Sequence, residues 1–486
     1  MPLPPLSTTS PLDWRYTAEG GANLVLSFLG AAHGPYTGRV LRLRKRKRRA
    51  TRGKEDEAIP SEVGTEFGAA VVEPLLGREQ VPAMEIVPLE RMWLEALVQR
   101  LKEEKARPPE REEEDEVDND AREAVVVEDL ITGEGVLAVE IKPKWGFLPS
   151  ATHLSETTRP IKRQYCRFCM HRYHKRASSV PSASGRTDLD AALVEHENGY
   201  CPLDLYSQDG RRIQTALDCL CDGWARSEGE SNNFRVFLDG KKLSPQDAPA
   251  KASLRSALSS LSKHSEASFS RPSSTKPPSP AARASLSSTL LPLLLASPVL
   301  ANLSRLQATL DCLDIEGIAQ RLKDDEETNV DLTRPEVDLS PLGEQPTLEE
   351  WTSWLNDHFH LLPKPPPSGP GDPPSAPVGP EPRTALKSAL CVEHPRAAIL
   401  AFLLSATFKD CSLIIRIPLP PSSSPTLAAT SLHSMEPTVK AIDLDPKPIS
   451  RLGKYWRMDR EIVREWAEML EGLSEEERGK VRRCRE

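Results

Sequence analysis

The sequence lacks several features that would place it in a secreted or nucleic-acid-wrapping class. Its formal net charge is −8, whereas proteins that bind nucleic acid non-specifically are usually basic overall. Its first fourteen residues hold no basic region followed by an apolar segment, so we expect no secretory signal. These absences argue against a secreted protein and against a general nucleic-acid binder.

Long apolar runs and disulfide-like cysteine patterns are missing as well. The most apolar stretch, 290–303, contains two prolines and is shorter than the about 20 residues that a membrane-spanning helix needs. We interpret it as a core helix and expect no membrane association. The nine cysteines are odd in number and show no regular spacing. This indicates a reducing compartment, the nucleus or the cytoplasm.

Proline is abundant, by contrast, and charge is segregated. Many of the 45 prolines cluster with serine near 244–287, 363–383 and 418–436, and such segments cannot build a core. We expect disordered insertions there. A basic run (42–54) holds nine Lys or Arg, and 110–118 holds seven acids. The basic run is either a nuclear import signal or a solvated loop.

Hydrophobic patterning predicts an α/β (α+β) protein with two lobes. Strand-like runs lie on both sides of a Gly-Gly turn within 14–30 and at 38–44, 124–130 and 136–141, with one helix at 89–105. These assign a mostly β N-terminal lobe to residues 12–150. Residues 151–475 form the second lobe. We expect helical or mixed segments at 160–176 and 187–225, helices at 303–324, 397–407 and 458–473, and strands at 234–238, 411–417 and 439–444.

Three segments have residue types suited to phosphate chemistry. Glu19-Gly20-Gly21-Ala22-Asn23 could let backbone N–H groups approach a phosphate, although a plain hairpin turn fits equally well. Lys142 and Lys144 flank a proline and hold two cations near each other. Asp410 precedes a strand and Asp443 ends another, as a base and a Mg²⁺ ligand would in a kinase-like site. Solvated lysines and turn-forming aspartates are the simpler alternatives.

A cysteine- and histidine-rich segment allows two interpretations. Cys166, Cys169, His171 and His174 are zinc-type ligands, but their spacing is crowded, and Cys219 and Cys221 make a poor second pair. The other interpretation is a basic helix face of Arg167, His171 and Lys175, spaced by four, that binds an anion. We therefore expect no stoichiometric zinc.

Nine blocks in the same order resemble the inositol-pentakisphosphate 2-kinase family and span nearly the whole chain. They are EGGANLVL (19–26), RVLRLRK (39–45), EIKPKWGFLP (140–149), RFCMH (167–171), YCPLDLYS (200–207), NNFRVFLDG (232–240), LDIEG (313–317), KDCSLIIRI (409–417) and IDLDPKPISRLGKYWRMDREIV (442–463). The resemblance implies a two-lobed fold distantly like protein kinases, with ATP bound by the first lobe and inositol phosphate by the second. It implies transfer of phosphate from ATP, with Mg²⁺, to the 2-hydroxyl of inositol 1,3,4,5,6-pentakisphosphate, which gives inositol hexakisphosphate (phytate).

The resemblance also implies roles for residues where motifs match. For the nucleotide they are Glu19, Gly20, Gly21, Ala22, Asn23, Arg42, Glu128, Asp129 and Glu140. For catalysis they are Asp410, Lys142 and Lys144, with Asp443 as the Mg²⁺ ligand. For the inositol phosphate they are Arg111, Lys142, Lys144, Arg167, His171, Lys175, Asn233 (with Asn232 alongside), Arg235, Lys447, Arg451 and Tyr455.

The segment after Asp443 is predicted to be a helix. Lys447, Arg451 and Tyr455 are spaced by four after Asp443, and Pro448 suits a first helical turn, so we expect one helix to present all three on one face.

Plant members of the family have a Cys/His zinc site after the LDIEG block, which this chain lacks. We expect a monomer that binds no nucleic acid; a zinc-dependent nucleic-acid-binding protein and an inactive kinase-fold scaffold are the alternatives.

Overall fold

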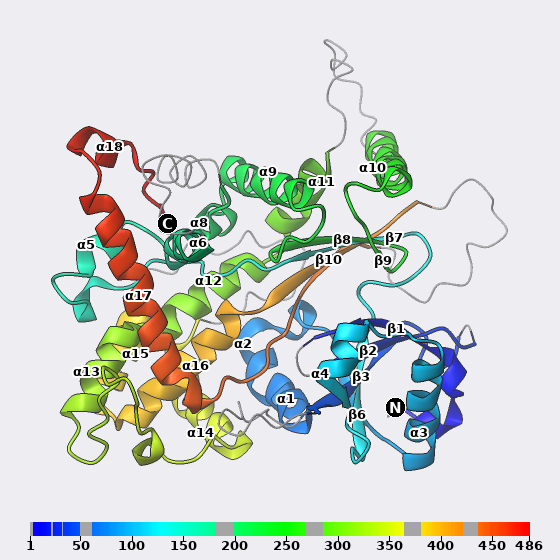
Figure 1. The fold of residues 1–486 in the computed structure, drawn as a ribbon, viewed down its shortest axis with the longest axis horizontal. Coiled ribbons are helices and arrows are strands. Elements are labelled where there is room, and N and C mark those ends of the chain that lie inside the picture. Colours follow the sequence, from blue (N-terminus) through cyan, green and yellow to red (C-terminus); the bar gives the residue numbers. More distant parts are fainter. Residues whose placement is uncertain are drawn as a thin grey trace, which may run out of the picture.

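A computed structural model gives the fold and describes residues 3–20, 23–31, 33–48, 61–179, 199–268, 285–363, 381–420 and 436–486. Two antiparallel sheets organise these residues (Figure 1). The N-terminal sheet has strand order β1-β2-β3-β6-β4, with β5 paired to β3. The second sheet has the order β11-β10-β7-β8-β9. Only the connection between β6 and β7, residues 129–135, leads directly from one sheet to the other among the described strands.

The N-terminal sheet is built from runs that alternate apolar and polar residues. Its strands are β1 (Trp14–Glu19), β2 (Asn23–Phe28), β3 (Arg39–Lys47), β4 (Met84–Pro88), β5 (Asp115–Val117) and β6 (Glu123–Glu128). In β3 the side chains of Leu41 and Leu43 are buried while their neighbours are partly exposed, as expected for a strand with one wet face. Helix α3 (Arg91–Glu103) covers the apolar face with Trp93, Leu94 and Leu97.

The second sheet lies inside the larger lobe. Its strands are β7 (Val136–Ile141), β8 (Phe234–Leu238), β9 (Lys241–Lys242), β10 (Ser412–Pro418) and β11 (Thr438–Ile442). Every residue of β7 and nearly every residue of β10 is buried, which explains why these strands have continuous apolar runs. The functional blocks lie at the ends of these two strands, so the sheet positions the candidate site.

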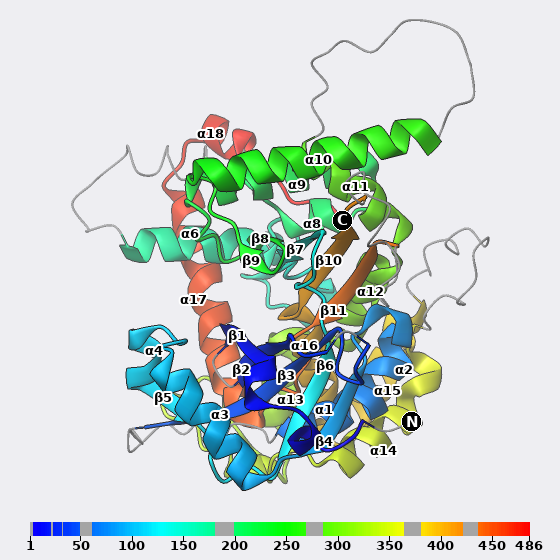
Figure 2. The same cartoon turned by 90° about the vertical axis from the view of Figure 1, so that its right-hand side faces the viewer.

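Helices surround the second sheet and lie between it and the first (Figures 1 and 2). The remaining ones before β10 are α1 (Ser61–Phe67), α2 (Glu73–Leu76), α4 (Pro109–Glu114), α5 (Arg159–Lys162), α6 (Arg167–Ser179), α8 (Pro202–Leu205), α9 (Gly210–Arg226), α10 (Ala248–Ser268), α11 (Leu286–Ala296), α12 (Val299–Leu310), α13 (Asp314–Asp324), α14 (Leu348–His358), α15 (Glu381–Val392) and α16 (Pro395–Lys409). After β11 come α17 (Leu452–Glu471) and α18 (Glu475–Lys480).

The predicted α+β class and most predicted elements are confirmed. The predicted strand 234–238 coincides with β8, and the helix expected at 89–105 is α3. The likeness to protein kinases stays a prediction. The first sheet ends at Glu128 and β7 joins the second sheet, so the change of sheet comes earlier than the lobe boundary expected near residue 150.

Two predicted features differ in the structure. The Ser-rich segment 244–287 was expected to be disordered, yet α10 occupies Ala248–Ser268, because its Ala, Leu and Lys residues favour helix. Residues 269–284 of that segment lie outside the described residues, as do 364–380 and 421–435 of the other two insertions. The helix expected over 303–324 is two helices, because residues 311–313 break it.

No single helix among the described residues is long and apolar enough to cross a membrane; the bent pair Leu286–Ala296 and Val299–Asp324 passes that test only when both parts are joined across a 66° bend.

Candidate active site

Asp410 lies between two lysines at the junction of α16 and β10. Its Oδ2 is 3.3 Å from Lys447 Nζ, and its Oδ1 is 3.5 Å from Lys144 Nζ. The Asp410 side chain is 58% exposed, whereas both lysines are largely covered. Partial burial would raise the pKa of Asp410, but Lys447 and Lys144 hold that pKa below its ordinary value. The site therefore presents an ionised carboxylate that is open to a ligand and flanked by cations.

The loop after β7 that carries Lys142 and Lys144 is fixed by hydrogen bonds to its backbone. Lys142 N donates to Asn233 O at 3.0 Å, and Asn233 Nδ2 donates to Lys142 O at 3.0 Å. Lys144 has a left-handed backbone, with φ of 67°, and Tyr206 Oη donates to its carbonyl at 3.2 Å. Asn233 thus supports this loop with its side chain, in addition to any contact with a ligand.

Gln307 ties the same loop to the end of α16. Its Nε2 donates to Lys144 O (3.2 Å) and to Phe408 O (2.9 Å), and its Oε1 accepts from Gly146 N (2.8 Å). The side chain is fully buried. The sequence-based account missed Gln307 because it lies in an apolar helical stretch, and missed Tyr206 although it belongs to the YCPLDLYS block.

Two further carboxylates, those of Glu140 and Asp443, lie beside this loop. Ser412 Oγ is 3.0 Å from Glu140 Oε1 and 3.4 Å from Asp443 Oδ2. Burial raises the pKa of Asp443, Arg42 opposes this increase, and Glu140 adds to it. Arg235 Nη1 lies 3.2 Å from the other oxygen of Glu140. Glu140 is buried and Asp443 is exposed, and two carboxylates that share Ser412 provide the oxygen ligands that Mg²⁺ prefers. Arg235 pairs with Glu140, and the charge of Arg42 acts on Asp443.

Helix α6 presents the predicted basic face toward the Lys142–Lys144 loop. Burial, together with the charges of Lys175, Arg167, His174 and Lys144, lowers the pKa of His171 to about 4. The influence of Lys144 shows that this face and the loop lie close together. At neutral pH the ring is therefore uncharged, whereas Arg167 and Lys175 carry charge.

The expected single helix for Lys447, Arg451 and Tyr455 is wrong. Lys447 precedes a 3₁₀ turn, Ile449–Arg451, and α17 begins only at Leu452, because Pro448 has an extended backbone, with ψ of 149°. The three side chains nevertheless converge: burial raises the pKa of Tyr455, Arg451 opposes that increase, and Asp410 acts on the same hydroxyl. The chain brings them together by a turn rather than by one helical face.

Glu19, which we predicted to contact the nucleotide, forms ion pairs with other side chains of the protein. It is buried, with Lys45 Nζ at 2.8 Å and Arg107 Nη2 at 2.6 Å from its Oε2, and Asp115 completes the cluster. Glu19 therefore anchors the base of the glycine turn, and its contact with the nucleotide stays a prediction. A Cβ built on Gly20 would meet nothing within 4 Å, and Gly20 N donates to Asn23 O at 2.9 Å. Gly21 and Ala22 lie outside the described residues.

Glu128 and Asp129 begin the connection between the sheets. Glu128 Oε2 accepts from Lys440 Nζ at 2.6 Å, and Asp129 Oδ1 accepts from Ile131 N (3.0 Å) and Thr132 N (2.8 Å). Both carboxylates thus hold the connection in place. Arg111 lies on α4 with Glu114 at 3.6 Å, and no contact among the described residues brings it to the cations around Asp410.

Four buried thiols form a candidate metal centre in the second lobe. The sulfur atoms of Cys166, Cys169, Cys201 and Cys484 all lie within 4.8 Å of one another, which is the ligand set of a structural zinc ion. His174 instead pairs with Glu465 at 2.8 Å. The zinc-free expectation rested on an incomplete ligand set, and that premise is wrong. The sequence could not pair Cys166 with two cysteines so far away along the chain.

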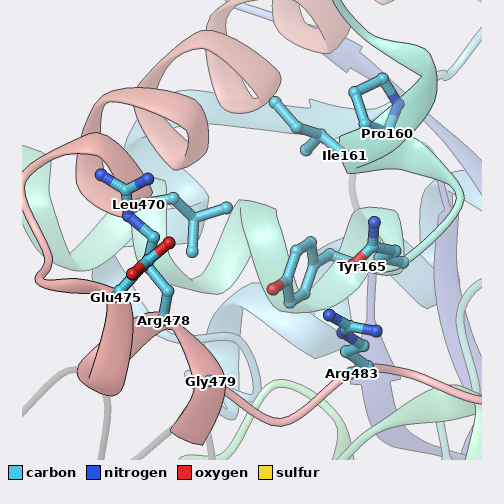
Figure 3. A pocket seen from close by; sticks show the side chains of 9 residues that line it. Pro160, Ile161, Tyr165, Leu470, Glu475, Arg478, Gly479 and Arg483 are labelled. Atoms are coloured by element: carbon cyan, nitrogen blue, oxygen red, sulfur yellow. The ribbon is translucent and has the colours of Figure 1, made fainter.

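The segment that carries Cys484 is fastened at several points. Cys484 N donates to Gln164 O at 2.9 Å, Leu148 N donates to Glu486 Oε1 at 2.5 Å, and Arg482 pairs with Asp204. A pocket of about 370 Å³ lies where this segment and α18 meet α5 and α17, with Arg483 and Tyr165 side by side in its wall (Figure 3). None of the predicted site residues lines it.

Comparisons with known proteins show the family of the chain. The family model described as inositol-pentakisphosphate 2-kinase matches residues 16–461. A protein of Cryptococcus neoformans named inositol-pentakisphosphate 2-kinase is 30% identical over 96% of this chain and 95% of its own length. A protein of the same name from Arabidopsis thaliana is 25% identical over 93% of this chain and 92% of its own, and one from Danio rerio is 28% identical over 48% of this chain and 44% of its own. The chain belongs to the inositol-pentakisphosphate 2-kinase family and is a kinase.

Proposed function

We propose that this kinase transfers the γ-phosphate of ATP to the 2-hydroxyl of inositol 1,3,4,5,6-pentakisphosphate and so forms inositol hexakisphosphate. The observation that carries the proposal is Asp410, an ionised and open carboxylate with a lysine at each oxygen. A carboxylate suited to act as a base and cations suited to neutralise phosphate are thus held within one site.

The charge of the proposed substrate explains why the site needs so many cations. Each phosphate carries about −1.5 to −2 near neutral pH, so five of them repel one another strongly. Lys142, Lys144 and Arg235 approach from the second sheet, Arg167 and Lys175 from α6, and Lys447 and Arg451 from the segment before α17. Cations from separate elements would neutralise phosphates on different sides of a ring.

Asp410 would orient the attacking hydroxyl and accept its proton late in the transfer. Lys144 and Lys447 now lie against its oxygens, and an incoming phosphate would compete for both ammonium groups. The same lysines would neutralise charge that develops on the transferring phosphoryl group. The chemistry of this step therefore depends on one carboxylate and its two neighbours.

The carboxylates of Asp443 and Glu140 fit a magnesium ion. Both contact Ser412, and partial burial together with Glu140 raises the pKa of Asp443. A divalent cation would relieve that unfavourable proximity, and when bound it would supply charge neutralisation at the phosphates of ATP. Arg42 would add a further positive charge at the same location.

For ATP itself, the turn at Gly20–Asn23 and the connection at 129–135 are the proposed contacts. Open space around Gly20 supports close approach of a phosphate to the backbone. The buried cluster of Glu19 with Lys45 and Arg107 would keep this turn in place. We assign the adenine to the connection between the sheets, where Glu128 and Asp129 act by fixing its backbone.

Incubating the purified protein with Mg-ATP and a panel of inositol phosphates tests the proposal. Chromatography should reveal inositol hexakisphosphate from the 1,3,4,5,6-pentakisphosphate and none with Asp410→Asn. No product from any member of the panel would leave an inactive scaffold, and salt-dependent DNA binding without ATP turnover would favour the nucleic-acid alternative.

We propose a compartment and an oligomeric state for the enzyme. All nine cysteines are free thiols, which supports the nucleus or cytoplasm as the compartment. We propose that the enzyme acts as a monomer; light scattering of the purified chain would test this directly.

A further inference from the structure

A buried network of charges lies next to α6 and is not used by the proposed chemistry. Lys162 is 3% exposed, and its Nζ lies 2.6 Å from Asp314, 3.2 Å from Glu316 and 2.9 Å from Asp459. An ammonium group has as many N–H donors as it has carboxylate partners here, so Lys162 is fully engaged. These residues come from α5, α13 and α17, three elements that meet behind the site.

Asp459 connects this network to the substrate face. One of its oxygens accepts from Lys162, and the other accepts from Arg167 Nη1 at 2.9 Å. The guanidinium of Arg167 also lies over the ring of Trp145, 4.9 Å from its centroid. A carboxylate on one side and an aromatic ring on another restrict how the guanidinium can turn.

The balance of charge favours a role that includes Arg167. Asp314, Glu316 and Asp459 are three buried carboxylates with Lys162 alone at their centre, and Arg167 supplies the second cation that they meet. Burial would raise the pKa of Asp459, but Lys162 and Arg167 hold that pKa below its ordinary value. Asp459 thus stays ionised and keeps its attraction for Arg167.

One residue of the network, Asp314, has a strained backbone conformation. Asp314 has φ of 61°, a left-handed conformation that is uncommon outside glycine. Its Oδ1 accepts from Glu316 N at 3.1 Å, and Glu316 Oε2 accepts from Ser155 N and Thr158 Oγ1 at 3.0 and 2.9 Å. Such strain persists where the surroundings determine the conformation, often near functional sites.

We propose that Asp459, held in place by Lys162 and its other carboxylate partners, is a positioning residue that aims Arg167 at a phosphate of the inositol substrate. The proposal rests on the proposed function, because it takes Arg167 as a substrate contact. The proposal gives a role to Asp314 and Glu316 of the LDIEG block and to Asp459 on α17. The network sets the affinity for the inositol phosphate and leaves ATP affinity to other residues.

A double-mutant cycle between Asp459 and Arg167 tests this role. Asp459→Asn keeps an oxygen but loses the charge that orients the guanidinium, and small misplacement of a positioning group can cost up to about a hundredfold. We expect the KM for inositol pentakisphosphate to rise roughly tenfold or more and the KM for ATP to stay within about twofold. In an Arg167→Gln background, Asp459→Asn should add little, because the two residues act as one unit.

A matched control separates positioning from stability. Asp204 is a carboxylate on α8 that is nearly as well buried and pairs with Arg212 at 3.0 Å and with Arg482. Asp204→Asn should lower the melting temperature without a selective rise in the KM for the inositol phosphate. If Asp459→Asn folds poorly, the double variant Arg167→Gln/Asp459→Asn, which removes both charges of the pair, provides the comparison with Arg167→Gln alone.

The outcomes are distinguishable. If Arg167→Gln raises the KM for the inositol phosphate while Asp459→Asn does not, or if the two effects multiply independently, the positioning role is wrong and the proposed function stands. If Arg167→Gln itself leaves that KM unchanged, the substrate assignment of Arg167 fails, and the inference fails with it. A chain without any turnover would instead contradict the proposed function.

Discussion

Lys447 Nζ lies 3.3 Å from Asp410 Oδ2, so the proposed base and one of the proposed phosphate contacts form an ion pair before any substrate is present. The pair keeps Asp410 ionised and Lys447 directed into the site. An incoming phosphate would compete with Asp410 for this lysine, which would release the carboxylate for the hydroxyl. The base and the substrate contact are therefore linked.

Asp410→Asn should reduce turnover at least about a hundredfold, since a general base contributes about 10²- to 10⁴-fold. Binding should persist, because removing a negative charge from an anion site cannot weaken its attraction for phosphate. Initial rates together with calorimetric binding of both ligands measure this. Asp247→Asn, at an exposed position before α10, serves as the control. Turnover close to wild type would exclude the role of Asp410.

Lys447→Ala should weaken apparent affinity for the inositol phosphate far more than for ATP. A charge-assisted hydrogen bond is worth roughly 1.5–3 kcal/mol, and about 1.4 kcal/mol corresponds to tenfold. The expected increase in the KM is therefore roughly ten- to a hundredfold. Lys454→Ala, an exposed lysine on the same segment, should change neither KM. Equal losses for both substrates would refute the assignment.

Glu19→Gln should destabilise the N-terminal sheet. It leaves Lys45 and Arg107 buried with one fewer partner, and removing one member of a buried ion cluster costs about 3–5 kcal/mol. Thermal unfolding and the KM for ATP report the two consequences. Glu116→Gln, which loses a partly exposed contact with Arg46, should lower the melting temperature far less, because water screens exposed ion pairs. A Glu19→Gln variant that is stable but binds ATP more weakly would instead indicate that Glu19 contacts the nucleotide directly.

Binding of inositol phosphate should draw a proton onto His171. The pKa of this ring is about 4 in the unliganded protein because burial and neighbouring cations favour the neutral form. A bound phosphate favours the charged form, so the pKa rises and a proton is taken up between pH 4 and the new value. Calorimetry in buffers of different ionisation enthalpy counts that proton. His171→Gln should remove this part of the uptake while the titration of the ligand's own phosphates remains; identical proton counts would contradict the account.

The lowered pKa of His171 also makes the stability of the folded protein depend on pH. The unfolded ring takes up a proton near pH 6.5, whereas the folded ring does so only near pH 4. The contribution of His171 to stability is therefore present above pH 6.5 and is lost as the pH falls toward 4. Melting temperatures of wild type and His171→Gln should differ less at pH 7 than at pH 5, where the variant should be the more stable.

The purified protein should contain one zinc ion per chain, contrary to what the sequence alone favours. Four thiols within 4.8 Å of each other fit tetrahedral zinc, and the thiols would release their protons as they bind the ion as thiolates. Elemental analysis of Cys484→Ser should show loss of metal and a lower melting temperature. Cys221→Ser, outside the cluster, should keep its zinc. A metal-free wild-type protein with four reactive thiols would overturn this expectation.

The sequence predicted elements whose patterns are local. Apolar runs such as Phe234–Leu238 are strands because neighbouring residues determine them, and Asp410 was found because it lies at the start of such a strand. The helix proposed for Lys447 failed because the backbone at Pro448 is extended. Lys447, Arg451 and Tyr455 are spaced by four in the sequence, but they do not share one helix.

Contacts between distant segments could not be predicted. Lys162 meets Asp314 and Asp459 only after three elements have packed together. Cys484 joins Cys166 because the segment after α18 returns to α6. A buried lysine looks like a surface residue in a sequence, and isolated cysteines give no sign of their partners. The family blocks marked these regions without indicating what they do.

The position of the new phosphate tests the central claim most directly. Inositol 1,3,4,5,6-pentakisphosphate and Mg-ATP are incubated with the protein, and the product is examined by proton and phosphorus NMR. We predict that one phosphate is added per molecule, at the 2-position, with one ADP formed for each. ADP formed without phosphorylated inositol, or a product that still has a free 2-hydroxyl, would contradict the account.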